Sequence, residues 1–160
     1  MSDLSALCEC IDQTFSTAAP DLSWKEKLAV LMRGLGQQEQ VECPLKHYFA
    51  PGVYVREIFM PAHAVIIGKI HRTEHFNIIQ QGCVSLLHED GSREVLRAPH
   101  TFVSKPGVQK VLYIHENTVW STIHITEERD LERLEAALIE PADYPCFDRT
   151  AERLAIEEAS

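Results

Sequence analysis

The spacing of apolar residues changes twice along the chain, and each change predicts a change of secondary structure. In residues 4–15 and 24–35, apolar side chains recur every three or four positions, which predicts two amphipathic helices. Ser23 and Glu26 have the spacing of a capping box, so the second helix is expected to begin directly after Ser23.

Between residues 50 and 126 the apolar residues fall in short runs rich in Val, Ile and aromatic side chains, separated by Gly, Pro, Asp and Asn. Eight such runs at near-regular spacing are typical of the strands of a sandwich or barrel. The runs are GVYVREIFM, AVIIGKI, HFNIIQQG, CVSLLHE, REVLRA, TFVS, KVLYIH and VWSTIHIT. The sequence EDGS at 89–92 predicts a hairpin turn, because Asp-Gly tolerates positive φ.

After residue 126 the helical spacing returns. Leu131, Leu134 and Leu138 are spaced to share one face of a helix. Thr126 is the expected N-cap, and the acidic residues that follow it suit the first turn of a helix. A last short helix is expected over 148–160.

These patterns predict a single, mainly β domain. With 160 residues, of which 45% are hydrophobic, the chain is large enough to bury one core. We expect an N-terminal helical extension over 1–44, a barrel over 45–126 and a C-terminal helical extension over 127–160.

The charge balance restricts the kinds of partner. A formal net charge of −9 argues against general binding to nucleic acid polymers or to an anionic membrane face, because like charges repel. It permits a small anionic ligand that is held by a few local cations. No apolar run approaches the ~20 residues that span a bilayer. The N-terminus has no basic start followed by a long apolar core, so no signal peptide is expected.

The cysteines indicate a reducing environment. There are five of them, an odd number, and no two have Cys-x-x-Cys spacing. A disulfide framework and a four-cysteine zinc site are therefore not expected, and a cytoplasmic location is. We interpret Cys8 and Cys10 as ordinary residues of the first helix.

The residues best suited to chemistry concentrate in 68–82. His71 and His75 lie four apart, with Glu74 between them and Asn77 just beyond. Imidazole binds transition metals and also titrates near neutral pH, so the pair is a candidate for either role. The other histidines of the chain are expected in solvent-facing turns or loops, with the exception of His124. They are His47, His63, His88, His100 and His115.

Two stretches of this region resemble the signature motifs of the cupins, which are double-stranded β-helix proteins. The first cupin motif contains His-x-His, a glutamate and a closing glycine, and the second contains a proline-glycine turn followed by a histidine. His71 matches the second histidine and Gly82 the closing glycine. Lys69 and His75 stand where the family has its first histidine and its glutamate. Lys110 stands where the histidine of the second motif would be.

The resemblance implies a cupin-type jelly-roll barrel whose mouth holds the functional residues, and it implies a homodimer. Residues 46–79, with VSKPG at 103–107 and VWSTIH at 119–124, also resemble a group of small cupin-like proteins that are encoded by tailed bacteriophages. For a phage protein, the expected location is the host cytoplasm.

Binding of a small anionic molecule without metal is the function we expect first. Lysines, histidines and Arg72 would make the mouth cationic, and Tyr113, Trp120 or Phe76 would stack on a planar ring. Such a pocket suits a nucleotide or another phosphorylated metabolite, including a host signalling nucleotide that a phage protein sequesters. The candidate ligand-binding residues are Lys69, His71, His75, Asn77, Lys110, Tyr113, Trp120 and His124.

A metal-dependent cupin enzyme, namely an oxygenase, isomerase or hydrolase, is the main alternative. His71, His75 and His124, or His115 in place of His124, would bind Fe, Ni, Mn or Zn, with or without Glu74 as a further ligand. Lysines at two family ligand positions weigh against it, because an ammonium group beside a divalent ion costs Coulomb energy.

Two further interpretations stay open. Metal-free acid-base catalysis would use His71 or His75 as the base and Tyr113 as the acid. A structural or virion-associated module would carry the pocket without using it.

Overall fold

The structure, a computed structural model, describes residues 22–37 and 39–141. Residues 41–88 and 93–141 form one compact unit, called the barrel unit below, and helix α2 (Trp24–Gly36) belongs to a second unit. In α2 the predicted capping box is confirmed, since the Ser23 hydroxyl accepts from the Glu26 amide and the Glu26 carboxylate accepts from the Ser23 amide at 2.7 Å. The helices predicted over 4–15 and 148–160 lie outside the described residues.

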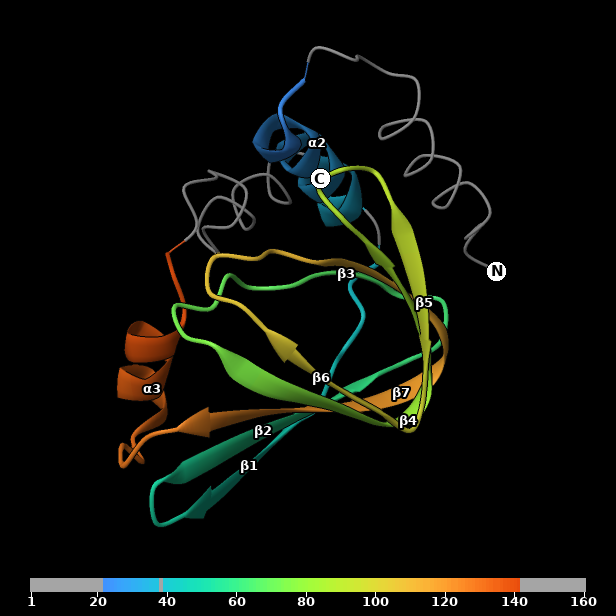
Figure 1. The fold of residues 1–160 in the computed structure, drawn as a ribbon. Coiled ribbons are helices and arrows are strands. Elements are labelled where there is room, and N and C mark those ends of the chain that lie inside the picture. The colour runs from blue at the N-terminus through green and yellow to red at the C-terminus, as the bar shows by residue number, and fades with distance from the viewer. Residues whose placement is uncertain (1–21, 38, 142–160) are drawn as a thin grey trace. The chain divides into compact units, whose positions relative to one another are not determined.

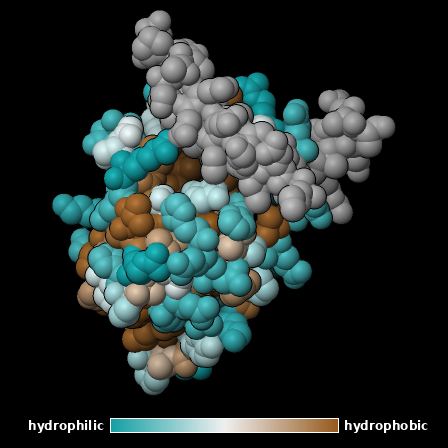
Figure 2. Space-filling model, turned by 90° about the vertical axis from the view of Figure 1, so that its right-hand side faces the viewer, coloured by the Kyte–Doolittle hydropathy of each residue, from teal (hydrophilic) through white to brown (hydrophobic). Residues whose placement is uncertain are grey.

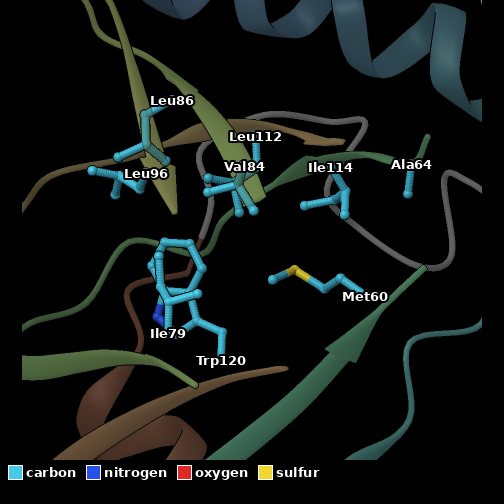
Figure 3. Close-up of a cluster of buried hydrophobic side chains, with 9 residues drawn as sticks. All are labelled: Met60, Ala64, Ile79, Val84, Leu86, Leu96, Leu112, Ile114 and Trp120. Carbon is cyan, nitrogen blue, oxygen red and sulfur yellow. The ribbon is translucent and has the colours of Figure 1, made fainter. Parts of the chain in front are cut away.

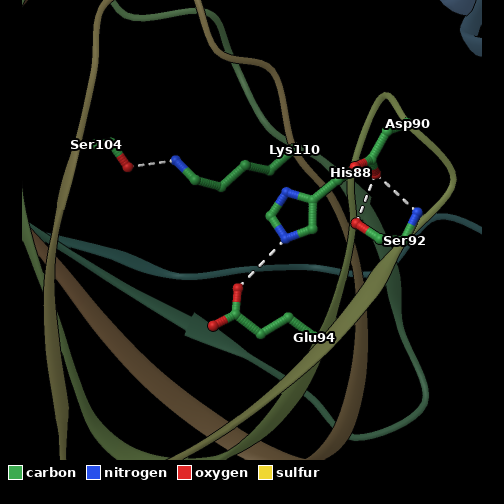
Figure 4. Close-up of polar contacts among 6 residues, drawn as sticks. All are labelled: His88, Asp90, Ser92, Glu94, Ser104 and Lys110. Atoms are coloured by element: carbon green, nitrogen blue, oxygen red, sulfur yellow. Dashed lines mark hydrogen bonds and ion pairs between the residues drawn. The ribbon is translucent and has the colours of Figure 1, made fainter.

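The barrel unit is an antiparallel sheet, so the predicted mainly β class is confirmed (Figure 1). Its strands are β1 (Leu45–Ala50), β2 (Val53–Met60), β3 (Val65–Ile67), β4 (His75–Leu87), β5 (Arg93–Arg97), β6 (His100–Ser104) and β7 (Val111–Ile125). The order is β1-β2-β7-β4-β5, with β3 paired to β7 and β6 paired to β4. The predicted turn joins β4 to β5, where the Ser92 amide donates to the Asp90 carboxylate at 2.8 Å (Figure 4).

Two long strands connect the two layers of the unit. β4 has 13 residues and β7 has 15, and they pair along most of their length with register shifts between Ile79 and Val84. Before the shifts β4 pairs with β6, and after them with β5. The sheet therefore folds over on itself at this bend. The prediction of four short strands here was wrong, because the polar residues 116–118 lie within a continuous strand and do not interrupt it.

The main hydrophobic core lies between the two layers (Figure 3). Ile79, Val84 and Ile114 are completely buried, and Met60 is 2% exposed. Each such side chain contributes about 1.5–3 kcal/mol through removal of apolar surface from water. On the side of the molecule shown in Figure 2, hydrophobic residues are scattered among hydrophilic ones.

Helix α3 (Leu131–Leu138) closes one end of the barrel unit. Leu134 and Leu138 pack against Tyr54 of β2 in a second small core. The N-cap is Asp130, whose carboxylate accepts from the Arg133 amide at 3.0 Å, and the predicted N-cap Thr126 was wrong. Both residue types cap helices, and Asp130 is the one that lies directly before the buried stripe. Within the described part of the chain, no helix is both long and apolar enough to cross a bilayer.

Gly82 is required where β4 bends against β7. Its φ is +98°, a conformation that L side chains rarely adopt. An added Cβ would lie 2.6 Å from the Asn117 carbonyl oxygen and 2.8 Å from the Thr118 Cα. Both neighbours are backbone atoms of the paired strand, so neither can move without opening the ladder between β4 and β7.

We expect Gly82→Ala to lower the free energy of unfolding by about 3 kcal/mol or more, because backbone strain and a steric clash add together. Gly107→Ala is the matched control. Gly107 also has a positive φ of +80°, but its Cβ would meet nothing within 4 Å. Urea unfolding of both variants measures the difference, and equal losses would show that the contact with β7 is unimportant.

Candidate metal and ligand site

Three histidines meet at one end of the barrel unit. His75 is the first residue of β4, and it is buried on the same face as Asn77 and Ile79. His124 lies near the end of β7 and is 2% exposed. His71 lies in the loop before β4, where it forms an isolated β-bridge with Ile139.

The donor atoms of His71, His75 and His124 all lie within 4.8 Å of one another. The ring centroids are 4.2 Å apart for His71 and His75, 5.3 Å for His71 and His124, and 4.9 Å for His75 and His124. Metal–nitrogen bonds of ~2.0–2.1 Å require donor atoms roughly 3–3.5 Å apart. The three rings would have to approach one another by roughly an ångström or more to coordinate one ion together.

The hydrogen bonds around these rings leave lone pairs available. The His75 Nδ1 is 3.0 Å from the Thr73 carbonyl oxygen, which can only accept, so Nδ1 carries the proton and Nε2 keeps its lone pair. The Nδ1 atoms of His71 and His124 are buried without a hydrogen-bond partner. A buried polar atom without a partner costs free energy, and a bound cation would remove that cost. The residues present thus fit a divalent transition metal.

Burial keeps the three imidazoles neutral. Desolvation, with help from the neighbouring histidines and from Lys110 and Arg56, lowers the pKa of His71 to about 3. Desolvation, followed by the charges of His75 and Arg56, lowers the pKa of His124 to about 4. The pKa of His75 is also lowered, mainly by desolvation. Neutral imidazole is the form that binds metal.

A pocket of about 190 Å³ adjoins the three histidines. Its walls are mostly apolar, and a few polar groups project from them. The lining residues are Arg56, Ile58, Met60, Ile66, Ile67, Gly68, Lys69, His71, His75, Asn77, Lys110, Leu112, Trp120, Thr122 and Ile139. Three of these lining residues are cationic, namely Arg56, Lys69 and Lys110, and none of the described residues that line the pocket is acidic. The local charge is therefore opposite to that of the whole protein.

A chain of hydrogen bonds fixes one side of the pocket. The Trp120 indole donates to the side-chain oxygen Oδ1 of Asn77 at 3.0 Å, and the side-chain nitrogen Nδ2 of Asn77 donates to the Ser104 hydroxyl at 2.9 Å. The Lys110 ammonium donates to the same hydroxyl at 2.6 Å (Figure 4). The side chain of Lys110 is therefore oriented by a neutral hydroxyl and not by a carboxylate. Burial also lowers the pKa of Lys110.

Arg56 lines the pocket from β2, although the sequence analysis did not name it. Burial lowers its pKa, an effect that the charges of Tyr54 and Glu135 oppose. The inward face of β2 carries Tyr54, Arg56 and Ile58, because every second residue of a strand points to the same side. The sequence signal for Arg56 was thus an arginine at an inward position of an otherwise apolar run.

The structure brings most of the predicted ligand-binding residues together. Lys69, His71, His75, Asn77, Lys110 and Trp120 line the pocket, and His124 lies beside His71 and His75. Lys69 also forms an ion pair with Glu135 of α3.

Tyr113 is the predicted site residue that lies elsewhere. It alternates with the buried Leu112 and Ile114, so it faces the other side of β7, where its hydroxyl is 3.2 Å from the His63 Nδ1. His115 lies on that side as well, within β7 and not in the loop expected for it, and contacts the Ser85 hydroxyl. Neither residue lines the pocket.

Three other residues near the two histidines lie outside the pocket. Phe76 is 53% exposed, because it alternates with the inward residues of β4. Arg72 donates from Nε to the Ile139 carbonyl oxygen at 3.2 Å. The side chain of Glu74 is exposed as well and does not line the pocket.

The segment after α3 fixes the loop that carries His71. The Arg72 amide donates to the Leu138 carbonyl oxygen, and the Glu140 amide donates to the Ile70 carbonyl oxygen, each at 2.8 Å. The side chain of Ile139 lines the pocket between these two bonds. The end of α3 therefore holds His71 in place and closes part of the pocket.

No family model matches the chain, and no curated protein matches it either. Solved structures of cupin proteins are similar to it at low identity. A cupin domain from Bordetella pertussis is 16% identical with a TM-score of 0.45, and the match covers 56% of this chain and 98% of that one. An RmlC-like cupin with a double-stranded β-helix fold from Methanocaldococcus jannaschii is 12% identical with a TM-score of 0.45, covering 56% and 84%. A cupin-2 domain protein from Shewanella frigidimarina is 12% identical with a TM-score of 0.43, covering 72% and 99%. Likeness at this level says nothing of ligand or reaction.

The lowered histidine pKa values predict that metal-free protein loses stability in mild acid. Between the usual pKa of 6.5 and the folded values of about 3 and 4, the unfolded chain binds more protons than the folded one. The free energy of unfolding then falls as the pH falls, by up to about 1.4 kcal/mol per pH unit for each histidine.

Urea unfolding in chelator at about pH 7.5, 6.0 and 5.0 measures this loss. The variant His71→Gln/His124→Gln is the control, and its stability should depend less on pH over the same range. An identical dependence in both proteins would contradict the assignment of the effect to these two rings.

Proposed function

We propose that the protein is a metal-dependent cupin in which His71, His75 and His124 bind one divalent transition-metal ion and the adjoining pocket binds a small molecule. The convergence of three neutral imidazoles, two of them buried and that of His71 partly buried, carries this proposal, together with the two buried Nδ1 atoms that have no partner. Three neutral nitrogen donors suit Fe, Ni, Mn or Zn, and they leave coordination positions open toward a ligand.

A metal ion bound here would act as a Lewis acid on a substrate oxygen. The protein's own residues hold and orient the reactants. The Thr73 carbonyl fixes the His75 ring through Nδ1–H, which also makes the opposite nitrogen a better donor. Ile58, Leu112 and Ile139 line the pocket with apolar surface, and this limits the access of water to the substrate.

The geometry favours a metal-dependent function over the metal-free binding expected first from the sequence. The obstacle was the pair of lysines at family ligand positions, and both have other partners. Lys69 pairs with Glu135, and Lys110 donates to Ser104. Three histidines remain to bind the metal without either lysine.

The pocket volume favours a ligand smaller than a nucleotide. A cavity of about 150 Å³ holds benzene, whereas a nucleotide has roughly twenty heavy atoms or more. The pocket, at about 190 Å³, suits a molecule of roughly six to ten heavy atoms. This supports a small metabolite as the ligand in preference to a host signalling nucleotide.

Metal content tests the proposal. Protein purified without a histidine tag and dialysed against Zn²⁺, Ni²⁺, Mn²⁺ or anaerobic Fe²⁺ should retain about one ion per chain of at least one of these metals. His75→Ala and His124→Ala should each weaken binding of that metal by about 100-fold, because each removes a ligand and leaves two. Elemental analysis and calorimetric titration give the stoichiometry and the affinity.

His88→Ala is the matched control, since His88 pairs with Glu94 outside the pocket. This variant should bind metal as the wild type does. Full occupancy in His75→Ala, or equal losses in His88→Ala, would place the metal elsewhere and contradict the proposal.

A further inference from the structure

Two positive charges in the pocket form no ion pair with a carboxylate of the described residues, although the charge of Glu135 acts on Arg56. Arg56 and Lys110 both line the pocket, and burial lowers the pKa of each. Within the described residues, no hydrogen bond or ion pair holds the Arg56 guanidinium, and the Lys110 ammonium bonds only to the neutral Ser104 hydroxyl. Buried charges are normally paired, so two such cations beside one cavity call for an explanation.

The two cations approach the pocket from different sides. Arg56 pairs in register with Thr122 of β7, next to the strand position of His124. Lys110 reaches Ser104 of β6, which pairs in register with His75. The charge of Arg56 accordingly affects His71 and His124, whereas that of Lys110 affects His71 and His75. A ligand that bridges the two would pass across the histidine cluster.

The number of unused donors is large. A guanidinium has five N–H groups and an ammonium has three. Lys110 uses one of its donors on Ser104, and the described residues accept none from Arg56. The planar fork of an arginine matches a carboxylate with two parallel hydrogen bonds, and a lysine binds a second anionic group as a point charge.

Much of the pocket wall is apolar. Ile58, Met60, Ile66 and Leu112 line the pocket, and they offer no hydrogen bonds from their side chains to a ligand. A carbon chain, rather than a sugar or a base with many polar groups, suits such walls. The volume of about 190 Å³ suits a chain of a few carbons between the acidic groups.

We propose that the pocket binds a short dicarboxylate, with one carboxylate on Arg56 and the other on Lys110, and with its carbon chain against the apolar walls. The proposal rests on the ligand pocket of the proposed function, and it deepens that function by naming the class of ligand. It does not require the metal, so the two are tested separately.

The test compares glutarate with valerate, which has the same carbon chain and only one carboxylate. Calorimetric titration is done on metal-free and on metal-loaded protein, with succinate and adipate added to the series. At least one dicarboxylate should bind about tenfold or more tightly than valerate in both forms, because the second carboxylate gains a charge-assisted hydrogen bond. Ethyl phosphate, whose charges lie at one end only, should bind more weakly than that dicarboxylate.

Arg56→Met and Lys110→Met should each remove the preference for the dicarboxylate over valerate. Lys46→Met is the matched control, because Lys46 has a side chain that is 71% exposed and lies outside the pocket. It should keep the preference. Circular dichroism and metal content are measured on the same samples, and the Met variants should retain the fold and the metal.

The inference is overturned if none of the three dicarboxylates binds more tightly than valerate, if ethyl phosphate binds more tightly than all of them, or if Arg56→Met keeps the full preference. If the wild-type protein prefers the dicarboxylate but binds no metal, the result contradicts the proposed metal centre alone. If the wild-type protein binds metal but shows no preference for a dicarboxylate over valerate, the result contradicts the ligand class alone.

Discussion

The pairing of β4 with β7 is the constraint on which the rest of the structure depends. Both strands continue through the bend, so each contributes to both layers. The bend places Ile79 and Val84 of one strand, and Ile114 of the other, in the core between the layers. The same pairing brings His75 at the start of β4 toward His124 near the end of β7, since Phe76 and Ile123 are partners in the register. If one strand slipped by one residue against the other, its inward side chains would point outward. The core and the histidine cluster would then be lost together.

The site combines neutral donors and buried cations in an acidic protein. Desolvation acts in the same direction on His71, His75, His124 and Lys110, because it disfavours every charged form. For the histidines this keeps lone pairs available for a metal. For Arg56 and Lys110, it means that an anion entering the pocket would meet weakly solvated charges, with which its Coulomb interaction is stronger than in water. The two proposals thus follow from one physical cause, the burial of titratable groups at the end of the barrel unit.

Local sequence signals predicted the features that depend on neighbours in the chain. The β-rich region, the capping box at Ser23 and the Asp-Gly turn at 89–92 are of this kind. Features that depend on long-range pairing were missed or misassigned. Strand β1 was not predicted, since its partner in β2 rather than its own composition makes it a strand. The polar residues 116–118 suggested a loop because sequence alone does not show that β4 pairs alongside them.

The same division applies to the candidate site. The spacing of His71 and His75 within one segment drew attention to them, and the cupin resemblance added Lys110. Tyr113 was included because the sequence alone does not show which face of a strand points into the pocket, and the two runs predicted at 110–115 and 119–126 form one continuous strand. Arg56 was missed because its place in the pocket follows from the pairing of β2 with β7, which is a long-range contact.

Metal coordination by three imidazoles is the central claim, and a crystal structure of the metal-loaded protein tests it most directly. Diffraction data collected on both sides of the absorption edge of the bound metal locate the ion independently of any model. The account predicts one strong anomalous peak with nitrogen atoms of His71, His75 and His124 at ~2.0–2.2 Å. A peak at another place, or electron density in which the three rings point away from a common centre, would contradict it.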